Sequence, residues 1–105
     1  MLIKEGTTTD AYQTATVHPL GKKLNLVLKN KHASNIITAK VFGYVTEGDT
    51  DSGVQLRAEG DLAGTIAEEL EVTKVYEEVV VSVKTKTSPN HAGFEIHAAI
   101  SKVGV

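Results

Sequence analysis

The sequence predicts an all-β chain, an antiparallel β-sandwich of seven or eight strands that is jelly-roll-like or immunoglobulin-like. Valine occurs 13 times and threonine 12 times among the 105 residues, and such β-branched side chains favour a sheet over a helix. Several short runs alternate between apolar and polar residues, which is the period of a half-buried strand. Turn-forming residues separate these runs about every ten residues, as in sandwiches and barrels.

The first two expected strands lie on either side of a turn at Pro19. Residues 11–18 alternate, with Ala15 and Val17 on one side, and the missing N–H of Pro19 ends the run. In residues 23–29 all three leucines fall on one face, while the lysines and the asparagine fall on the other. This second run is one of the clearest strands of the chain.

Residues 36–46 form a third run in which both faces are fairly apolar, so the strand should lie centrally in a sheet or at a contact. Two sets of side chains compete for the buried face, and they are Ile37, Ala39, Val41 and Val45, or Ile36, Phe42 and Tyr44. The acidic, glycine-containing stretch 47–53 indicates an exposed hairpin loop. The returning strand alternates Val54, Leu56 and Ala58 with Gln55, Arg57 and Glu59.

The segment 62–76 permits two interpretations. Three apolar residues recur every four positions, as in a short helix, and they are Leu62, Ile66 and Leu70. The second half of the segment alternates, less cleanly, as a strand does. We favour the strand, because Gly64 and Thr65 are poor residues for a helix interior and the neighbouring segments are strongly β.

Two further strands complete the expected sandwich. Residues 78–86 place three valines on the core face. After a turn around Pro89, the last strand points Phe94, Ile96, Ala98 and Ile100 inward.

The chain is long enough for one hydrophobic core but not for two, so we expect a polar arm at residues 1–10 and a single sandwich domain at residues 11–105. The absence of cysteine excludes disulfides, thiolate zinc sites and cysteine nucleophiles. No apolar run approaches the roughly 20 residues of a membrane span, and no leader peptide follows Met1. We therefore expect no membrane contact and synthesis in the cytoplasm, from which an assembled particle could later leave.

Two sets of residues offer ligands for a metal ion, and neither set is complete. Asp49 and Asp51 supply the oxygen ligands that calcium prefers, but Gly53 stands where a third ligand is needed. Of the four histidines, only His91 and His97 are close in sequence, and no third donor stands at a helpful spacing. We expect no metal and no cofactor.

The residues of an active site are incomplete as well. The chain lacks a Gly-x-Ser-x-Gly turn, and nothing ties a particular serine to a histidine. Carboxylates are plentiful in the segment 59–78, but adjacent strand residues point to opposite faces. A glycine-rich phosphate cradle is missing too. These observations predict that the protein is not an enzyme.

Charge is unevenly distributed along the chain, although the formal net charge is only −2. Residues 22–40 contain lysines and no acid, whereas residues 59–78 contain seven acids and Lys74 alone among basic residues. The simpler interpretation is two solvated edges, with lysines that prevent edge-to-edge pairing of sheets. The alternative is a head-to-tail contact between the lysine segment of one subunit and the acidic segment of the next, which could close a ring. A basic, aromatic-bearing face for nucleic acid is not indicated.

The strands and turns follow one another in a distinctive order over most of the chain. The pattern comprises the polar run 4–10, the strand and Lys-Asn pair of 26–30, the segment 39–44, the acidic hairpin 47–53 and the closing strands from residue 76. This order resembles that of small β-sandwich proteins in the virions of tailed phages and related archaeal viruses. The resemblance implies a capsid decoration, tail or other virion component that self-associates, and it carries over no functional residues.

Protein–protein contact is therefore the function we expect, with the chain itself and other virion proteins as partners. Phe42 and Tyr44 are the expected centre of the contact, so replacing Tyr44 with serine should weaken assembly without unfolding the domain. The expected charged rims are Lys29, Lys31, Lys40, Glu69, Glu71 and Glu78. The alternative is a module that binds carbohydrate or another ligand, for which Tyr12 and Tyr44 are the best candidates for an exposed aromatic platform.

Overall fold

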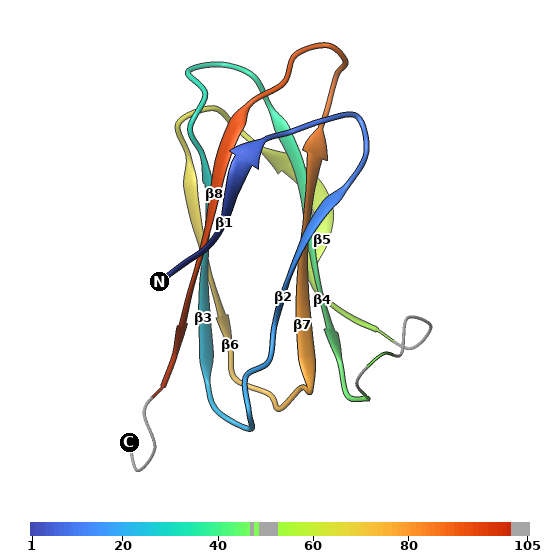
Figure 1. Cartoon of the computed structure of the whole chain (residues 1–105), viewed down its shortest axis with the longest axis vertical. Helices are drawn as coiled ribbons and strands as arrows, with labels where there is room; N and C mark the ends of the chain where they lie inside the picture. The colour runs from blue at the N-terminus through green and yellow to red at the C-terminus, as the bar shows by residue number, and fades with distance from the viewer. Residues whose placement is uncertain (47, 49–52, 102–105) are drawn as a thin grey trace.

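The computed structural model describes residues 1–46, 48 and 53–101, and it contains two antiparallel four-stranded sheets packed face to face (Figure 1). Sheet A has the strand order β1-β8-β3-β6, and sheet B has the order β2-β7-β4-β5. The strands are β1 (Leu2–Thr7), β2 (Gln13–Val17), β3 (Leu24–Asn30), β4 (Ile37–Tyr44), β5 (Val54–Leu62), β6 (Ala67–Val72), β7 (Glu78–Thr85) and β8 (Gly93–Ile100). The predicted fold class, an all-β sandwich, is confirmed.

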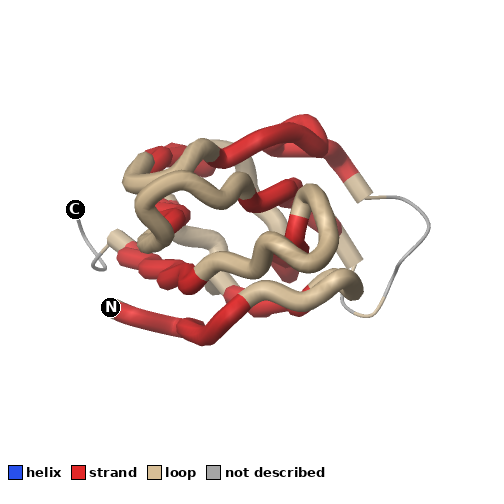
Figure 2. The backbone as a smooth tube through the Cα atoms, turned by 90° about the horizontal axis from the view of Figure 1, so that it is seen from above, coloured by secondary structure: helices blue, strands red, loops and turns tan. Residues whose placement is uncertain are grey.

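Seen from above, strands and loops account for the whole described part of the chain, with no helix among them (Figure 2). The described residues therefore include no helix that could span a bilayer.

The core lies between the sheets, and most of it comes from alternate inward-facing residues of β3, β4, β7 and β8. The leucines of β3 enter this layer from sheet A and the valines of β7 enter it from sheet B, and β4 and β8 add alternate apolar side chains. The side chains that are least exposed include Leu26, Ile37, Val41, Val79 and Val81. Full burial of one such side chain contributes roughly 1.5–3 kcal/mol, so this layer supplies most of the driving force for folding.

The two possible faces of the third predicted strand are now distinguished. Ile37, Ala39 and Val41 point into the core, and Phe42 and Tyr44 lie on the outer face of sheet B. Val45, which we grouped with the inward set, lies beyond the end of β4 and is 65% exposed. That assignment was wrong, because the alternation stops where the chain leaves the sheet.

The ends of the chain contain two further differences from the prediction. Residues 2–7 lie within the expected arm, yet they form β1, an edge strand that pairs with β8. Ile100, which we expected to be buried, is 40% exposed, because it is the last residue of β8. The segment 62–76 contains β6, so the strand interpretation of this segment is confirmed.

The strand β5 departs from the predicted alternation at Arg57. The pairing with β4 shifts register here, because Val41 lies opposite Arg57 and Phe42 lies opposite Gln55. This bulge turns the Arg57 side chain away from the face that a regular alternation would give it together with Gln55 and Glu59. Only 12% of that side chain is exposed. The guanidinium reaches the open edge of the sandwich and donates to the carbonyl of Ala39 at 2.6 Å.

Candidate functional site

The strongest candidate site lies on the outer face of sheet B. Because β4 buries alternate residues from Ile37 to Val41, its intervening side chains emerge on the opposite face. The neighbouring strands β2 and β7 add their own outward residues in register, with Ser82 opposite both Thr14 and Lys40. We name this surface the aromatic–lysine face, and it comprises Tyr12, Lys40, Phe42, Tyr44 and Lys84.

Tyr12 lies on this face and contacts three of its charged groups. The Tyr12 hydroxyl donates a hydrogen bond to the Glu59 carboxylate on β5, the edge strand opposite β2 in the sheet order. The ammonium groups of Lys40 and Lys84 lie 4.3 Å and 4.7 Å from the centroid of the Tyr12 ring. Such cation–π contacts each contribute about 0.5–1 kcal/mol at exposed sites.

The contacts of Tyr12 also shift two proton equilibria. Partial burial, together with the hydrogen bond to Glu59, raises the pKa of Tyr12 to about 12. The hydrogen bond from Tyr12 lowers the pKa of Glu59, and Lys84 and Lys40 lower it further. The phenol therefore stays protonated as the donor, and the carboxylate stays ionised as the acceptor.

Phe42 and Tyr44 form a pair of stacked rings on the same face. Their centroids are 6.5 Å apart, and the ring planes differ by 24°. The backbone of Gly53 lies against both rings, since a Cβ atom at this position would come within 2.6 Å of a Tyr44 carbon and 2.9 Å of a Phe42 carbon. A larger residue here would require the rings to move, so the close approach of this backbone restricts where the rings can lie.

A shallow hollow of about 360 Å³ lies between the rings and the lysine. Its lining residues are Thr14, Lys40, Phe42, Tyr44, Val80 and Ser82. Ser82 is 6% exposed on this face, and together with Thr14 it gives the hollow two hydroxyl groups. The hollow therefore combines an aromatic wall, a cation and hydroxyl groups.

Four of the predicted contact residues lie on or directly beside the other sheet, sheet A, and they are Lys29, Lys31, Glu69 and Glu71. We name the outer face of sheet A the mixed-charge face, and the residues that define it are Asn25, Val27, Lys29, Glu69, Glu71, Glu95 and His97. Lys29 lies opposite Glu95, and the Lys31 ammonium pairs with the Glu95 carboxylate at 2.9 Å. The His97 ring and Lys31 together lower the pKa of Glu95 to about 2.

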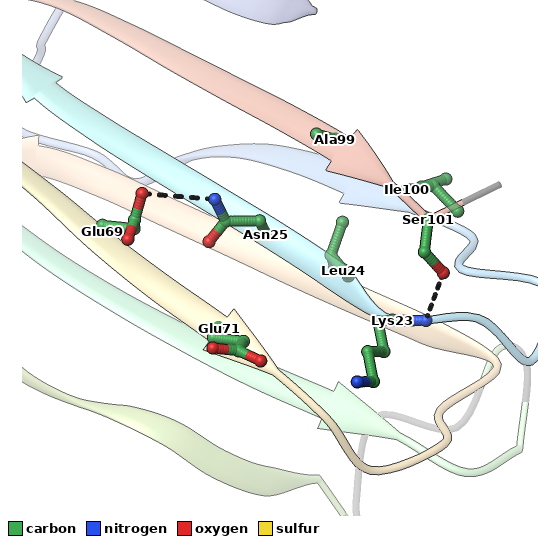
Figure 3. Close-up of a pocket in the computed structure, with 8 residues that line it drawn as sticks. All are labelled: Lys23, Leu24, Asn25, Glu69, Glu71, Ala99, Ile100 and Ser101. Atoms are coloured by element: carbon green, nitrogen blue, oxygen red, sulfur yellow. Dashed lines mark hydrogen bonds between the residues drawn. The ribbon is translucent and has the colours of Figure 1, made fainter. Parts of the chain in front are cut away.

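A second hollow, of about 340 Å³, brings the basic and acidic segments together on this side (Figure 3). Lys23 lines it together with Glu69 and Glu71, and the Asn25 side chain donates to Glu69 at 3.3 Å. The separation of charge along the sequence is therefore not a separation in space, because β3 and β6 are neighbours in sheet A. Glu78 lies apart from both groups, at the start of β7, where it accepts the N–H of Gly48 at 3.1 Å.

The candidate metal ligands differ in how far the structure describes them. The acidic residues of the calcium candidate at 47–52 lie outside the described residues. A ring nitrogen of each histidine makes a hydrogen bond within the protein. In His32, Nδ1 accepts the N–H groups of Ser34 and Asn35 at 3.0 and 2.9 Å. Within the described residues, His, Asp and Glu side chains form no group of three placed to share a metal ion.

Two elements of the face were not found by sequence reasoning. The pairing of Tyr12 with Glu59 joins residues 47 positions apart, and no local pattern marks it. Gly53 was assigned only to a turn, whereas its structural role is to leave room for Phe42 and Tyr44. A glycine directly before a strand was the one available signal for such a close approach.

No protein-family model and no curated protein matches the chain. Among solved structures, it is similar to the Yersinia pseudotuberculosis-derived mitogen, with a TM-score of 0.64 and 13% identity over 94% of this chain and 84% of that chain. It is also similar to a chain in the structure of infectious bursal disease virus Gx strain, with a TM-score of 0.54 and 8% identity. That match covers 90% of this chain but only 27% of the viral chain. These likenesses show the fold alone, a β-sandwich that is also found in a viral structure.

Proposed function

We propose that the chain is a non-enzymatic structural protein that acts through protein–protein contact, as a self-associating virion component such as a capsid decoration or tail protein. The observation that carries the proposal is the pair of partly exposed rings, Phe42 and Tyr44, on the outer face of sheet B. Partly exposed aromatic side chains are enriched at the energetic centres of protein interfaces. The sandwich fold shared with a viral chain is consistent with this role.

The aromatic–lysine face has the composition of a contact surface. Its centre holds two aromatic rings and Val80, and its rim holds Lys40 and the paired Tyr12 and Glu59. Burial of the rings against a partner would supply the affinity, while the charged rim would set the register of the contact. In this proposal the partners are further copies of the chain and other virion proteins, with no role for nucleic acid, a membrane or a cofactor.

The arrangement of charge modifies the head-to-tail hypothesis. Lys29, Glu69 and Glu71 share one face, so this surface is suited to pairing with its own copy about a twofold axis. The aromatic–lysine face is on the other side of the sandwich and remains free for a second neighbour. A chain with two such faces could link neighbouring molecules within a particle, after synthesis in the cytoplasm.

Light scattering on the purified chain, at low and high salt, tests the proposal. We expect an oligomer whose population falls when Tyr44 or Phe42 is replaced by serine, while the melting temperature stays close to that of the wild type. Val75→Ser is the control, because Val75 is an exposed apolar residue of the loop between β6 and β7, outside both faces. A monomer at every concentration and salt, or an oligomer unchanged by Tyr44→Ser, would contradict the proposal.

Glycan binding is the second candidate function, and the hollow on the aromatic–lysine face favours it. Two stacked rings beside hydroxyl groups offer both the apolar and the polar contacts that a sugar ring makes. A glycan array and a tyrosine-fluorescence titration test this function directly. Binding that is lost in Phe42→Ala but kept in Val75→Ser would support it, and no binding to any glycan would exclude it.

A further inference from the structure

The cations of the aromatic–lysine face are not balanced by the acid that contacts them. Lys40 and Lys84 both lie against the Tyr12 ring, and both act on the Glu59 carboxylate. That carboxylate also accepts the Tyr12 hydroxyl. Of the nearby cations, Lys86 is paired elsewhere, with Asp61 at 2.5 Å. Among the described residues, two ammonium groups and one carboxylate give this part of the face one excess positive charge. Such a surface prefers a ligand with one negative charge.

The hollow beside these cations has the dimensions of a small-ligand site. Its volume of about 360 Å³ is at the lower end of the roughly 300–1,000 Å³ found for such sites. The rings of Phe42 and Tyr44 form one wall, and Gly53 fills the space behind them with backbone alone. The hydroxyls of Thr14 and Ser82 complete the lining with groups that both donate and accept hydrogen bonds.

We propose that this hollow binds a carboxylated sugar, as a residue of an acidic glycan. The C–H face of the sugar ring would lie on Phe42 and Tyr44, its hydroxyls would bond to Thr14 and Ser82, and its carboxylate would meet the ammonium groups of Lys40 and Lys84. The inference rests on the second candidate function, glycan binding, and adds the charge of the ligand. One excess positive charge matches a monoanionic carboxylate better than a phosphate monoester, which carries about two negative charges at neutral pH.

Two ligands with the same sugar chain, one with ionised carboxylates and one with neutral methyl esters, provide the test. We would titrate the full chain with trigalacturonate and with its fully methyl-esterified form, following binding by calorimetry and by NMR of the backbone amides. The acid should bind at least about tenfold more tightly than the ester, because charge-assisted hydrogen bonds are stronger than neutral ones. Added salt should weaken the binding of the acid and leave that of the ester almost unchanged.

Matched variants assign the effect to the proposed residues. Lys40→Gln and Lys84→Gln should each weaken binding of the acid about tenfold without changing binding of the ester. Phe42→Ala should weaken both ligands, and a melting curve would show that this variant is folded. Lys29→Gln, on the opposite face, is the control and should change neither affinity.

The outcomes separate this inference from the function on which it rests. Equal affinity for the acid and the ester would overturn the carboxylate assignment while leaving glycan binding intact. If neither ligand nor any glycan binds, both ideas fail. Tighter binding of triglutamate or of adenosine monophosphate than of trigalacturonate would also overturn the inference, because the site would then recognise an acidic peptide or a nucleotide.

Discussion

The Arg57 guanidinium and the Glu68 carboxylate join the edge strand of one sheet to the edge strand of the other. Arg57 lies on β5 in sheet B, Glu68 lies on β6 in sheet A, and the two side chains make a bidentate pair. The same guanidinium donates to the carbonyls of Ala39 and Asp61 at 2.6 and 3.1 Å. One side chain therefore closes this side of the sandwich and donates hydrogen bonds to backbone carbonyls near the bulge in β5.

Arg57→Met should destabilise the protein by about 2–3 kcal/mol, because it leaves partly buried carbonyls and a carboxylate without a donor. Arg57→Lys should recover little of this loss, since an ammonium group cannot form the planar fork. Glu68 is more exposed than Arg57, so Glu68→Gln should lose no more than about 1 kcal/mol. Urea denaturation measures all three, and equal losses for Arg57→Met and Glu68→Gln would contradict this account.

Gly43→Ala should destabilise the core through Tyr76. A Cβ atom on Gly43 would lie 2.8 Å from two carbons of the Tyr76 ring, which is 5% exposed. Relieving this overlap requires the ring or the strand to move, and such overpacking typically costs about 1–3 kcal/mol. Gly60→Ala is the matched control on the neighbouring strand, because the nearest atom to its added Cβ is 3.9 Å away. Thermal unfolding of the two variants should therefore differ, and equal melting temperatures would refute the predicted clash.

The parts of this fold that could be predicted are those that alternate strictly between core and solvent. β3 buries every second residue, β8 does so as far as Ala98, and the valines of β7 alternate between the core and the outer face. In these strands the period of the sequence is the period of the structure. β1 is an exposed edge strand without a buried face, and it left no alternation to detect. The bulge at Arg57 reverses the expected side of one residue, and nothing local in the sequence marks it.

The candidate site was predictable only in part, for a related reason. Phe42 and Tyr44 were recognised because an apolar residue on the outer side of a strand is visible in the pattern. The lysine and glutamate segments were expected to form separate rims, but pairing of β3 with β6 places them side by side. The order of strands in a sheet depends on how distant segments pack, and so do contacts such as that of Tyr12 with Glu59. The periodicity of one segment carries no information about either.

Tyr12→Phe should lower the free energy of unfolding at neutral pH but not in strong alkali, where the wild type loses the same contribution. The pKa of Tyr12 is raised to about 12 in the fold, whereas an unfolded tyrosine titrates at about 10. The protonated phenol is thus favoured by folding, so its contribution is complete below about pH 10 and is lost as the pH rises towards 12. The difference in unfolding free energy between wild type and variant should follow this course. An NMR titration that places the Tyr12 midpoint near its ordinary value would contradict the hydrogen bond to Glu59.

Glu95 should show the opposite dependence at the acid end. Its carboxylate accepts hydrogen bonds from His97 and Lys31, each at 2.9 Å, and its pKa is lowered to about 2 from an ordinary value of 4.5. Folding therefore favours the ionised form, so the contribution is complete above pH 4.5 and is lost as the pH falls towards 2. Glu95→Gln should be less stable than the wild type at neutral pH and equally stable near pH 2.

His97→Ala removes the larger cause of the lowered pKa of Glu95, so the Glu95 midpoint measured by NMR should rise in this variant. Glu71→Gln, on the same face, should leave that midpoint unchanged. A Glu95 midpoint that stays low in His97→Ala would show that Lys31 alone holds the carboxylate.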